Sequence, residues 1–186
     1  MSQSFNDKFL IAGASSGDEQ AFGKLYDKYI DEIYKFIVMR VRSSDEAQDL
    51  TSEVFLKTWQ YISTGEEKQI DNIRALLYRI ARNIVIDHYR QSGRELSPLD
   101  EELFDKIPDK SLDLERDAQI KDDIREALSM VDELSEDYRE LVLMRYVQDL
   151  KVKEIAQILD KSSGAVRVSL HRAIKQLKNI LKGKDL

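Results

Sequence analysis

The middle of this 186-residue chain differs in composition from its two ends. Between residues 95 and 123 it carries eleven acidic and four basic side chains, and its only two prolines, Pro98 and Pro108, also lie there. A segment of this composition buries too little apolar surface to form a core. We therefore predict two separately folded parts, residues 1–94 and 114–186, joined by an acidic linker over residues 95–113.

Apolar residues in the N-terminal part recur every three or four positions, which is the period of an α-helix. The pattern predicts helices over residues 17–42, 43–62 and 73–91, with an aperiodic loop over 63–72. Ser16 with Glu19, and Ser43 with Glu46, have the spacing of capping boxes that mark helix starts. The fold class is therefore all-α, with an N-terminal helix bundle.

The C-terminal part contains the stretch KEIAQILDKSSGAVRVSLHRAIKQLK, residues 153–178. A short helix capped by Ser135 precedes it. Within the stretch, a turn at residues 160–162 separates two amphipathic helices, and Ser162 is placed to cap the second. The small Ala156 allows the two helices to cross closely, as a helix-turn-helix requires.

The second helix of this motif is predicted to expose a basic face. Its inner face carries Val166 and Leu170, and the opposite face presents four other residues: Arg167, His171, Arg172 and Lys175. The chain has a formal net charge of −6, but its C-terminal end is locally cationic. Such a helix fits the major groove of DNA. The alternative is an ordinary helical hairpin with a solvated basic face.

A second candidate basic face lies on the third N-terminal helix, residues 73–91, and it includes Arg74. Arginines on a surface helix are often only solvated, so nucleic-acid contact and a plain surface are both open. Tyr78 and Tyr89 are expected to lie near this face and to be more open, whereas the aromatics of the first helix are expected in the core.

Other functional classes find little support in the sequence. There is no cysteine, which excludes disulfides and thiol nucleophiles, and no metal-ligand cluster, P-loop or glycine fingerprint occurs. His88 and His171 have no carboxylate or hydroxyl partner at a telling spacing. No export signal or run of about 18 apolar residues is present. We expect a cytoplasmic protein that is not an enzyme, needs no cofactor and does not insert into a membrane.

Taken in order, four segments resemble the small bacterial sigma factors of the extracytoplasmic-function class. They are AFGKLYDKYIDEIYKFI, DEAQDLTSEVFLKTW, LLYRIARNIVIDHYR and the region from LSEDYRELVLMRYV through the helix-turn-helix, and together they cover about residues 20–180. The resemblance implies a protein that binds core RNA polymerase, directs it to promoters and assists DNA melting. Its expected partners are the β′ clamp helices and the β flap of polymerase, promoter DNA and an anti-sigma factor.

The resemblance also implies roles for individual residues. Asp49, Glu53 and Phe55 match positions that contact the β′ clamp helices, although Asp49 and Glu53 also fit a solvated face. The loop over 63–72 and the third helix match the element that reads the −10 region. The implied −10 contacts are Arg79, Arg82, Asn83, Asp87 and Arg90.

The helix-turn-helix matches the element that reads the −35 region. The implied −35 contacts are Arg167, His171, Arg172 and Lys175. Asp160 stands where the family usually has glycine in the turn, and aspartate tolerates left-handed backbone geometry better than most residues. Two rival functions remain: a helix-turn-helix regulator that binds duplex DNA without polymerase, and a helical adaptor whose basic faces bind acidic proteins.

Overall fold

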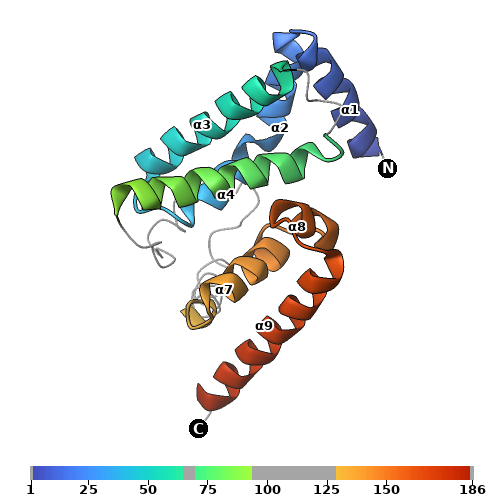
Figure 1. Ribbon diagram of the computed structural model, residues 1–186. Coiled ribbons are helices and arrows are strands. Elements are labelled where there is room, and N and C mark those ends of the chain that lie inside the picture. The colour runs from blue at the N-terminus through green and yellow to red at the C-terminus, as the bar shows by residue number, and fades with distance from the viewer. Residues whose placement is uncertain (1, 65–69, 94–128, 185–186) are drawn as a thin grey trace, which may run out of the picture. The chain divides into compact units, whose positions relative to one another are not determined.

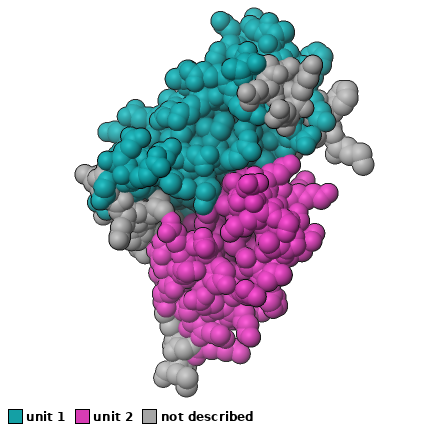
Figure 2. Space-filling model, in the orientation of Figure 1, with its two compact units in different colours: residues 1–97 teal, residues 98–186 magenta. Residues whose placement is uncertain are grey.

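The computed structural model describes residues 2–64, 70–93 and 129–184, and every regular element in those ranges is a helix (Figure 1). The all-α prediction is confirmed for that part of the chain. Two compact units are present, residues 1–97 and 98–186 (Figure 2). The predicted linker over 95–113, and the first residues of the predicted C-terminal part, lie outside the described residues.

The N-terminal unit consists of α1 (Ser2–Ser15), α2 (Glu19–Val38), α3 (Ser44–Ser63) and α4 (Ile73–Ser92). Helices α2, α3 and α4 pack against one another, and α1 packs on α2 and α3. The three predicted helices are therefore present as a bundle. Ile33, Phe36 and Ile37 from α2 are fully buried at its centre, and the Phe36 ring meets the Tyr78 ring edge-on at 5.1 Å.

Helix α1 was not predicted, and its presence changes the start of α2. Ser16 does not cap α2, because it belongs to the turn that ends α1, where its hydroxyl donates to the Gly13 carbonyl at 2.8 Å. Gly17 follows with φ +90, a left-handed conformation that suits glycine. The N-cap of α2 is Asp18, whose carboxylate accepts from the backbone N–H groups of Gln20 and Ala21.

Helix α2 ends four residues before the predicted position 42. Its C-cap is Met39, and residues 39–42 form the turn into α3. The predicted start of α3 is correct, since the Glu46 N–H donates to the Ser43 hydroxyl at 3.1 Å. The Glu46 carboxylate accepts from the N–H of Arg42, one residue before the cap.

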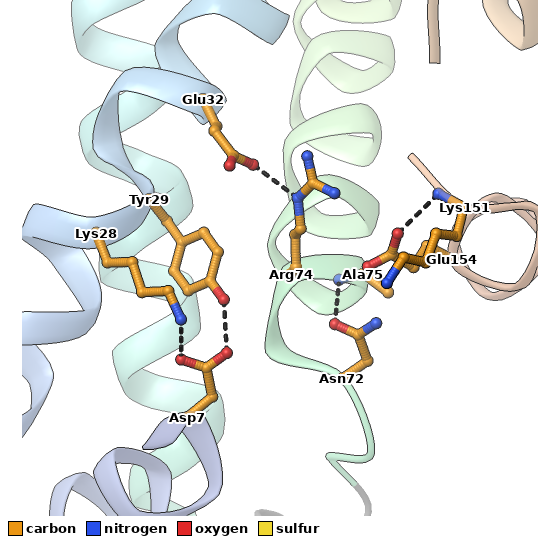
Figure 3. A network of polar contacts seen from close by, with 9 residues as sticks. All are labelled: Asp7, Lys28, Tyr29, Glu32, Asn72, Arg74, Ala75, Lys151 and Glu154. Atoms are coloured by element: carbon orange, nitrogen blue, oxygen red, sulfur yellow. Dashed lines mark hydrogen bonds and ion pairs between the residues drawn. The ribbon is translucent and has the colours of Figure 1, made fainter. Parts of the chain in front are cut away.

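Two contacts between α1 and α2 are specific, and the first of them is drawn in Figure 3. Asp7 is 8% exposed, and its carboxylate pairs with the Lys28 ammonium and accepts from the Tyr29 hydroxyl at 2.7 Å. At the other end, a Cβ on Gly13 would lie 2.9 Å from the Cβ of Ala21, so only glycine permits this approach of α1 to α2. Both contacts join residues far apart in the sequence.

The C-terminal unit contains α7 (Glu136–Val142), the π-helix η2 (Leu143–Val147), α8 (Val152–Ile158) and α9 (Ser163–Lys184). Helix α7 packs along α9, and α8 crosses its start. Ser135 is the N-cap of α7, as predicted, but its side chain makes no capping hydrogen bond. The fully buried residues of this core are Met144, Leu150, Ile155, Val166 and Ala173.

The predicted helix-turn-helix is confirmed in α8 and α9. Asp160 adopts φ +51, the left-handed geometry expected at the turn, and the N–H of Lys161 donates to the Ala156 carbonyl at 2.9 Å. The Ser162 hydroxyl accepts from the N–H of Ala165 at 3.1 Å, so Ser162 caps α9. Among the helices described, none has the length and apolarity needed to cross a membrane.

Candidate nucleic-acid interface

Helix α9 gathers cationic side chains on the face that points away from its unit. Val166, Leu170 and Ala173 are buried on the inner face. The four predicted residues of the outer face are all exposed: Arg167, His171, Arg172 and Lys175. None of the four has an acidic partner within the described part of the chain. Their charge is therefore available to an anionic ligand.

Helix α4 carries the second set of predicted residues along one side. Its N-cap is Asn72, whose side chain accepts from the Ala75 N–H, and it ends at Gly93 in the left-handed conformation. Five residues at helical spacing follow the same side, three of them exposed and two half-buried: Arg79, Asn83 and Arg90, and Arg82 and Asp87. The structure thus brings the predicted −10 residues together on one helix.

The α4 face differs from the α9 face in two respects. Arg90 is paired with Asp87 through an Nη2–Oδ1 distance of 3.0 Å, so this arginine already has a carboxylate beside it. Ile86 lies within the same row and is 37% exposed, which adds an apolar side chain that the sequence reasoning missed. An amide, an apolar group and partly paired arginines make a surface suited to bases as well as phosphates.

Three expectations for α4 are corrected. Tyr78 and Tyr89 are buried, at 1% and 5% exposed; Tyr78 packs on Phe36, and the Tyr89 hydroxyl donates to the Arg40 carbonyl at 2.8 Å. Burial, and secondarily the Glu32 carboxylate, raise the pKa of Tyr78 above its usual value. Arg74 is not on the open face, because its Nε pairs with Glu32 at 2.8 Å (Figure 3).

Helix α3 carries the three residues predicted to contact polymerase, two of them open to solvent and one buried. Asp49 is exposed, and Glu53 is half-exposed and paired with Lys57 at 2.7 Å. Phe55 is only 4% exposed, because its ring packs on Tyr26 with centroids 4.7 Å apart.

The exposed apolar residue of this face is the next one along the chain. Leu56 is 56% exposed and lies three residues after Glu53 and seven after Asp49. The spacing i, i+4, i+7 places Asp49, Glu53 and Leu56 on one helix face, so the sequence alone could have identified Leu56.

Neither histidine belongs to a catalytic arrangement in the described ranges. The His88 Nε2 atom lies 3.9 Å from the Glu46 carboxylate, and its ring stacks edge-on with Tyr89. His171 is exposed on α9. No group of three or more potential metal ligands gathers in the part of the chain that the structure describes.

Two family models match the chain, one in each unit. Residues 25–95 match "Sigma-70 region 2", which covers α3, α4 and most of α2. Residues 124–177 match "Sigma-70, region 4", which covers α7, α8 and the first two thirds of α9. Both candidate DNA-facing helices thus lie inside matched regions.

Individual relatives and solved structures agree with these models. The ECF RNA polymerase sigma factor BldN of Streptomyces coelicolor is 35% identical over 92% of this chain, which spans 64% of the length of BldN. SigX of Bacillus subtilis is 27% identical, with 86% of this chain and 83% of SigX covered. The structure of CnrH in complex with the cytosolic domain of CnrY superposes with a TM-score of 0.67 at 22% identity, covering 96% of this chain and 98% of CnrH.

Proposed function

Since this chain belongs to the extracytoplasmic-function class of the sigma-70 family, we propose that it binds core RNA polymerase and directs promoter-specific initiation of transcription. It recognises −10 and −35 elements and assists melting, and the polymerase performs the chemistry. The observation that carries the proposal is the row of exposed basic residues on α9, the second helix of a capped helix-turn-helix, which have no acidic partner among the described residues. That geometry suits the major groove.

The −35 element is read by the outer face of α9. Arginine can donate bidentately to the O6 and N7 atoms of guanine, and lysine pairs with phosphate. Arg167, His171, Arg172 and Lys175 supply these contacts in the proposal. Two observations support these contacts. All four side chains are exposed, and none has an acidic partner among the described residues, so they remain available to DNA.

The −10 element is read and opened by α4. The Asn83 side chain is exposed and can both donate to and accept from the edge of an unstacked base. Arg79, Arg82 and Arg90 hold phosphates around it, with Asp87 positioning Arg90 through their ion pair. Binding the single strand more tightly than the duplex offsets an unstacking cost of a few kcal/mol, so melting requires no ATP. Residues 65–69 of the predicted capture loop lie outside the described residues.

Polymerase is bound by the outer face of α3. Asp49 and Glu53 supply negative charge, and Leu56 supplies the apolar anchor that had been predicted at Phe55. Exposed carboxylates beside an apolar side chain suit a basic helical partner such as the β′ clamp helices, because charge steers the encounter and burial stabilises the complex. The β flap is the proposed partner of the C-terminal unit.

An anti-sigma factor completes the proposed set of partners, and the site of action is the cytoplasm, where the polymerase works. RpoE of Bartonella quintana was solved in complex with the anti-sigma factor NepR, and its fold is similar to that of this chain, with a TM-score of 0.62 at 21% identity. For the present chain, the expectation of such a partner rests on its family.

The test is transcription with purified components. Core polymerase plus this chain should initiate from a subset of promoters, and core polymerase alone should not. Leu56→Arg should weaken polymerase binding about 30-fold, as removal of about 2 kcal/mol at an interface centre would do. Phe9→Arg is the matched control, because Phe9 is an exposed apolar residue of α1 in the same unit. Absence of transcription from every promoter offered would contradict the proposal.

A further inference from the structure

The centre of the outward face of α9 is apolar. Val168 is 51% exposed, an unusual position for a valine on an otherwise polar helix face. It lies two residues from the buried Val166, and on a helix this spacing turns it to nearly the opposite side. Helical spacing places the basic residues around it: Arg167 beside it, and His171, Arg172 and Lys175 three, four and seven residues later.

In the turn that precedes Val168, this face carries only the methyl group of Ala165 and the bare backbone of Gly164. Gly164 lies four residues earlier, directly under Val168, because helical side chains lean toward the N-terminus. A Cβ on Gly164 would meet only the Ser162 hydroxyl, at an ordinary 3.8 Å. Packing within the protein therefore does not require glycine here, although glycine is unfavourable inside a helix. The space above this turn is open.

We propose that Gly164 and Val168 form a notch that receives the C5-methyl group of a thymine in the −35 element. This inference rests on the proposed function. The first turns of a recognition helix are the part that approaches base edges. In the major groove, the thymine methyl is the apolar group exposed at a base edge, and a small aliphatic side chain is its complement. The surrounding cations hold the phosphates and fix the depth at which α9 enters the groove.

This assignment separates two kinds of contact on one helix. Basic side chains that meet phosphates set affinity, and they do so at any sequence, whereas an arginine that meets guanine adds to the sequence preference. Val168 sets a preference for thymine, because its side chain gains contact area only where the base carries a methyl group. Cytosine presents an amino group at this edge, so Val168 would cover a hydrogen-bond donor that has no partner. Uracil has no methyl group, so Val168 would face water instead.

The experiment uses holoenzyme reconstituted from core polymerase and the full chain. Duplex promoters are first selected from a random library, and each thymine of the selected −35 element is then replaced singly by uracil, which removes only the methyl group. Uracil at one position should lower promoter binding about fourfold, the effect of one buried methyl-sized group. Replacement at the other positions should have little effect.

Two variants connect that effect to the notch. Val168→Ala should lower binding to the thymine promoter and reduce the uracil penalty to less than about twofold, because the methyl group has lost its contact. Gly164→Ala should also lower binding, by filling the notch, while raising the melting temperature of the chain. On a template already melted at −10 and lacking a −35 element, both variants should act as wild type.

The outcomes distinguish this inference from the function on which it rests. A holoenzyme that depends on the −35 element, yet is equally active with uracil at every thymine, overturns the notch alone. The notch is overturned in the same way if Val168→Ala keeps the full uracil penalty. A wild-type chain that yields no promoter selectivity with core polymerase overturns both.

Discussion

The cations of the N-terminal unit and those of α9 are used in different ways. In the N-terminal unit, Lys28 pairs with Asp7 and Arg74 with Glu32, so both cations are part of the fold's own structure. On α9, Arg167 and Arg172 are exposed and have no acidic partner among the described residues. Lys28 and Arg74 therefore stabilise the fold of the first unit, whereas the arginines of α9 face outward.

Because of this difference, we expect the two candidate DNA-binding helices to recognise DNA through different interactions. An α9 cation releases counterions when it meets a phosphate, so −35 binding should depend steeply on salt. On α4, Arg90 already has Asp87 beside it, and Asn83 and Ile86 are neutral. Recognition by α4 should thus depend more on the shape and edge of an unstacked base than on charge.

The largest predicted effect is on the internal charges of the N-terminal unit. Asp7→Ala should lower the free energy of unfolding of this unit by about 3 kcal/mol, because it leaves the Lys28 ammonium and the Tyr29 hydroxyl without their shared partner. Denaturant unfolding of the full chain, followed by the fluorescence of Trp59 in this unit, measures the change.

Asn6→Ala is the control for Asp7→Ala, since Asn6 is an exposed neighbour on α1. It should change the free energy of unfolding by less than about 0.5 kcal/mol. Equal stability of Asp7→Ala and wild type would show that the buried pair contributes nothing, and the contrast between the two units would fail.

An intermediate effect is expected when an outward cation is removed. Arg172→Ala should weaken −35-dependent promoter binding by about 1–3 kcal/mol and leave the free energy of unfolding unchanged. It should also reduce the slope of log K against log salt by about one. Filter binding of holoenzyme across a salt series gives both values.

Arg90→Ala provides the matched comparison on α4. Its effect on the salt slope should be clearly below one, because the Arg90 guanidinium is shared between Asp87 and the phosphate and so releases less than one counterion on binding. Identical slope changes for Arg90→Ala and Arg172→Ala would contradict the distinction between paired and unpaired cations.

The smallest effect concerns buried tyrosines and is confined to alkaline solution. Burial raises the pKa of Tyr78 and Tyr29 above the unfolded value of about 10. The folded state then keeps a proton that the unfolded state loses, so each tyrosine lowers the free energy of unfolding by about 1.4 kcal/mol per pH unit above pH 10.

Tyr78→Phe tests this contribution, because it removes the ionisable hydroxyl and keeps the ring contact with Phe36. The decline of the free energy of unfolding between about pH 10 and pH 11 should be shallower than in wild type. Tyr26→Phe is the control, since Tyr26 is 39% exposed. A decline as steep as that of wild type would show that Tyr78 does not contribute.

Features encoded by adjacent residues were predictable from the sequence. The left-handed turn at Asp160 and the Ser162 cap follow from local backbone chemistry, and the structure has both. The outer face of α9 followed from helical period alone. In each case the deciding residues are within a few positions of one another.

Features decided by distant residues were not predictable. Helix α1 is attached through Asp7 to residues of α2, and its apolar residues do not share one face, since Phe9 is 76% exposed while Leu10 and Ile11 are buried.

Promoter binding by the free chain, compared with binding by the holoenzyme, tests the central claim most directly. Gel shifts with one selected promoter, and with the same promoter scrambled at −10 and −35, would be run with and without core polymerase. We predict sequence-specific binding only when polymerase holds both units on the DNA. Equally tight and specific binding by the chain alone would contradict this claim and identify a stand-alone helix-turn-helix regulator.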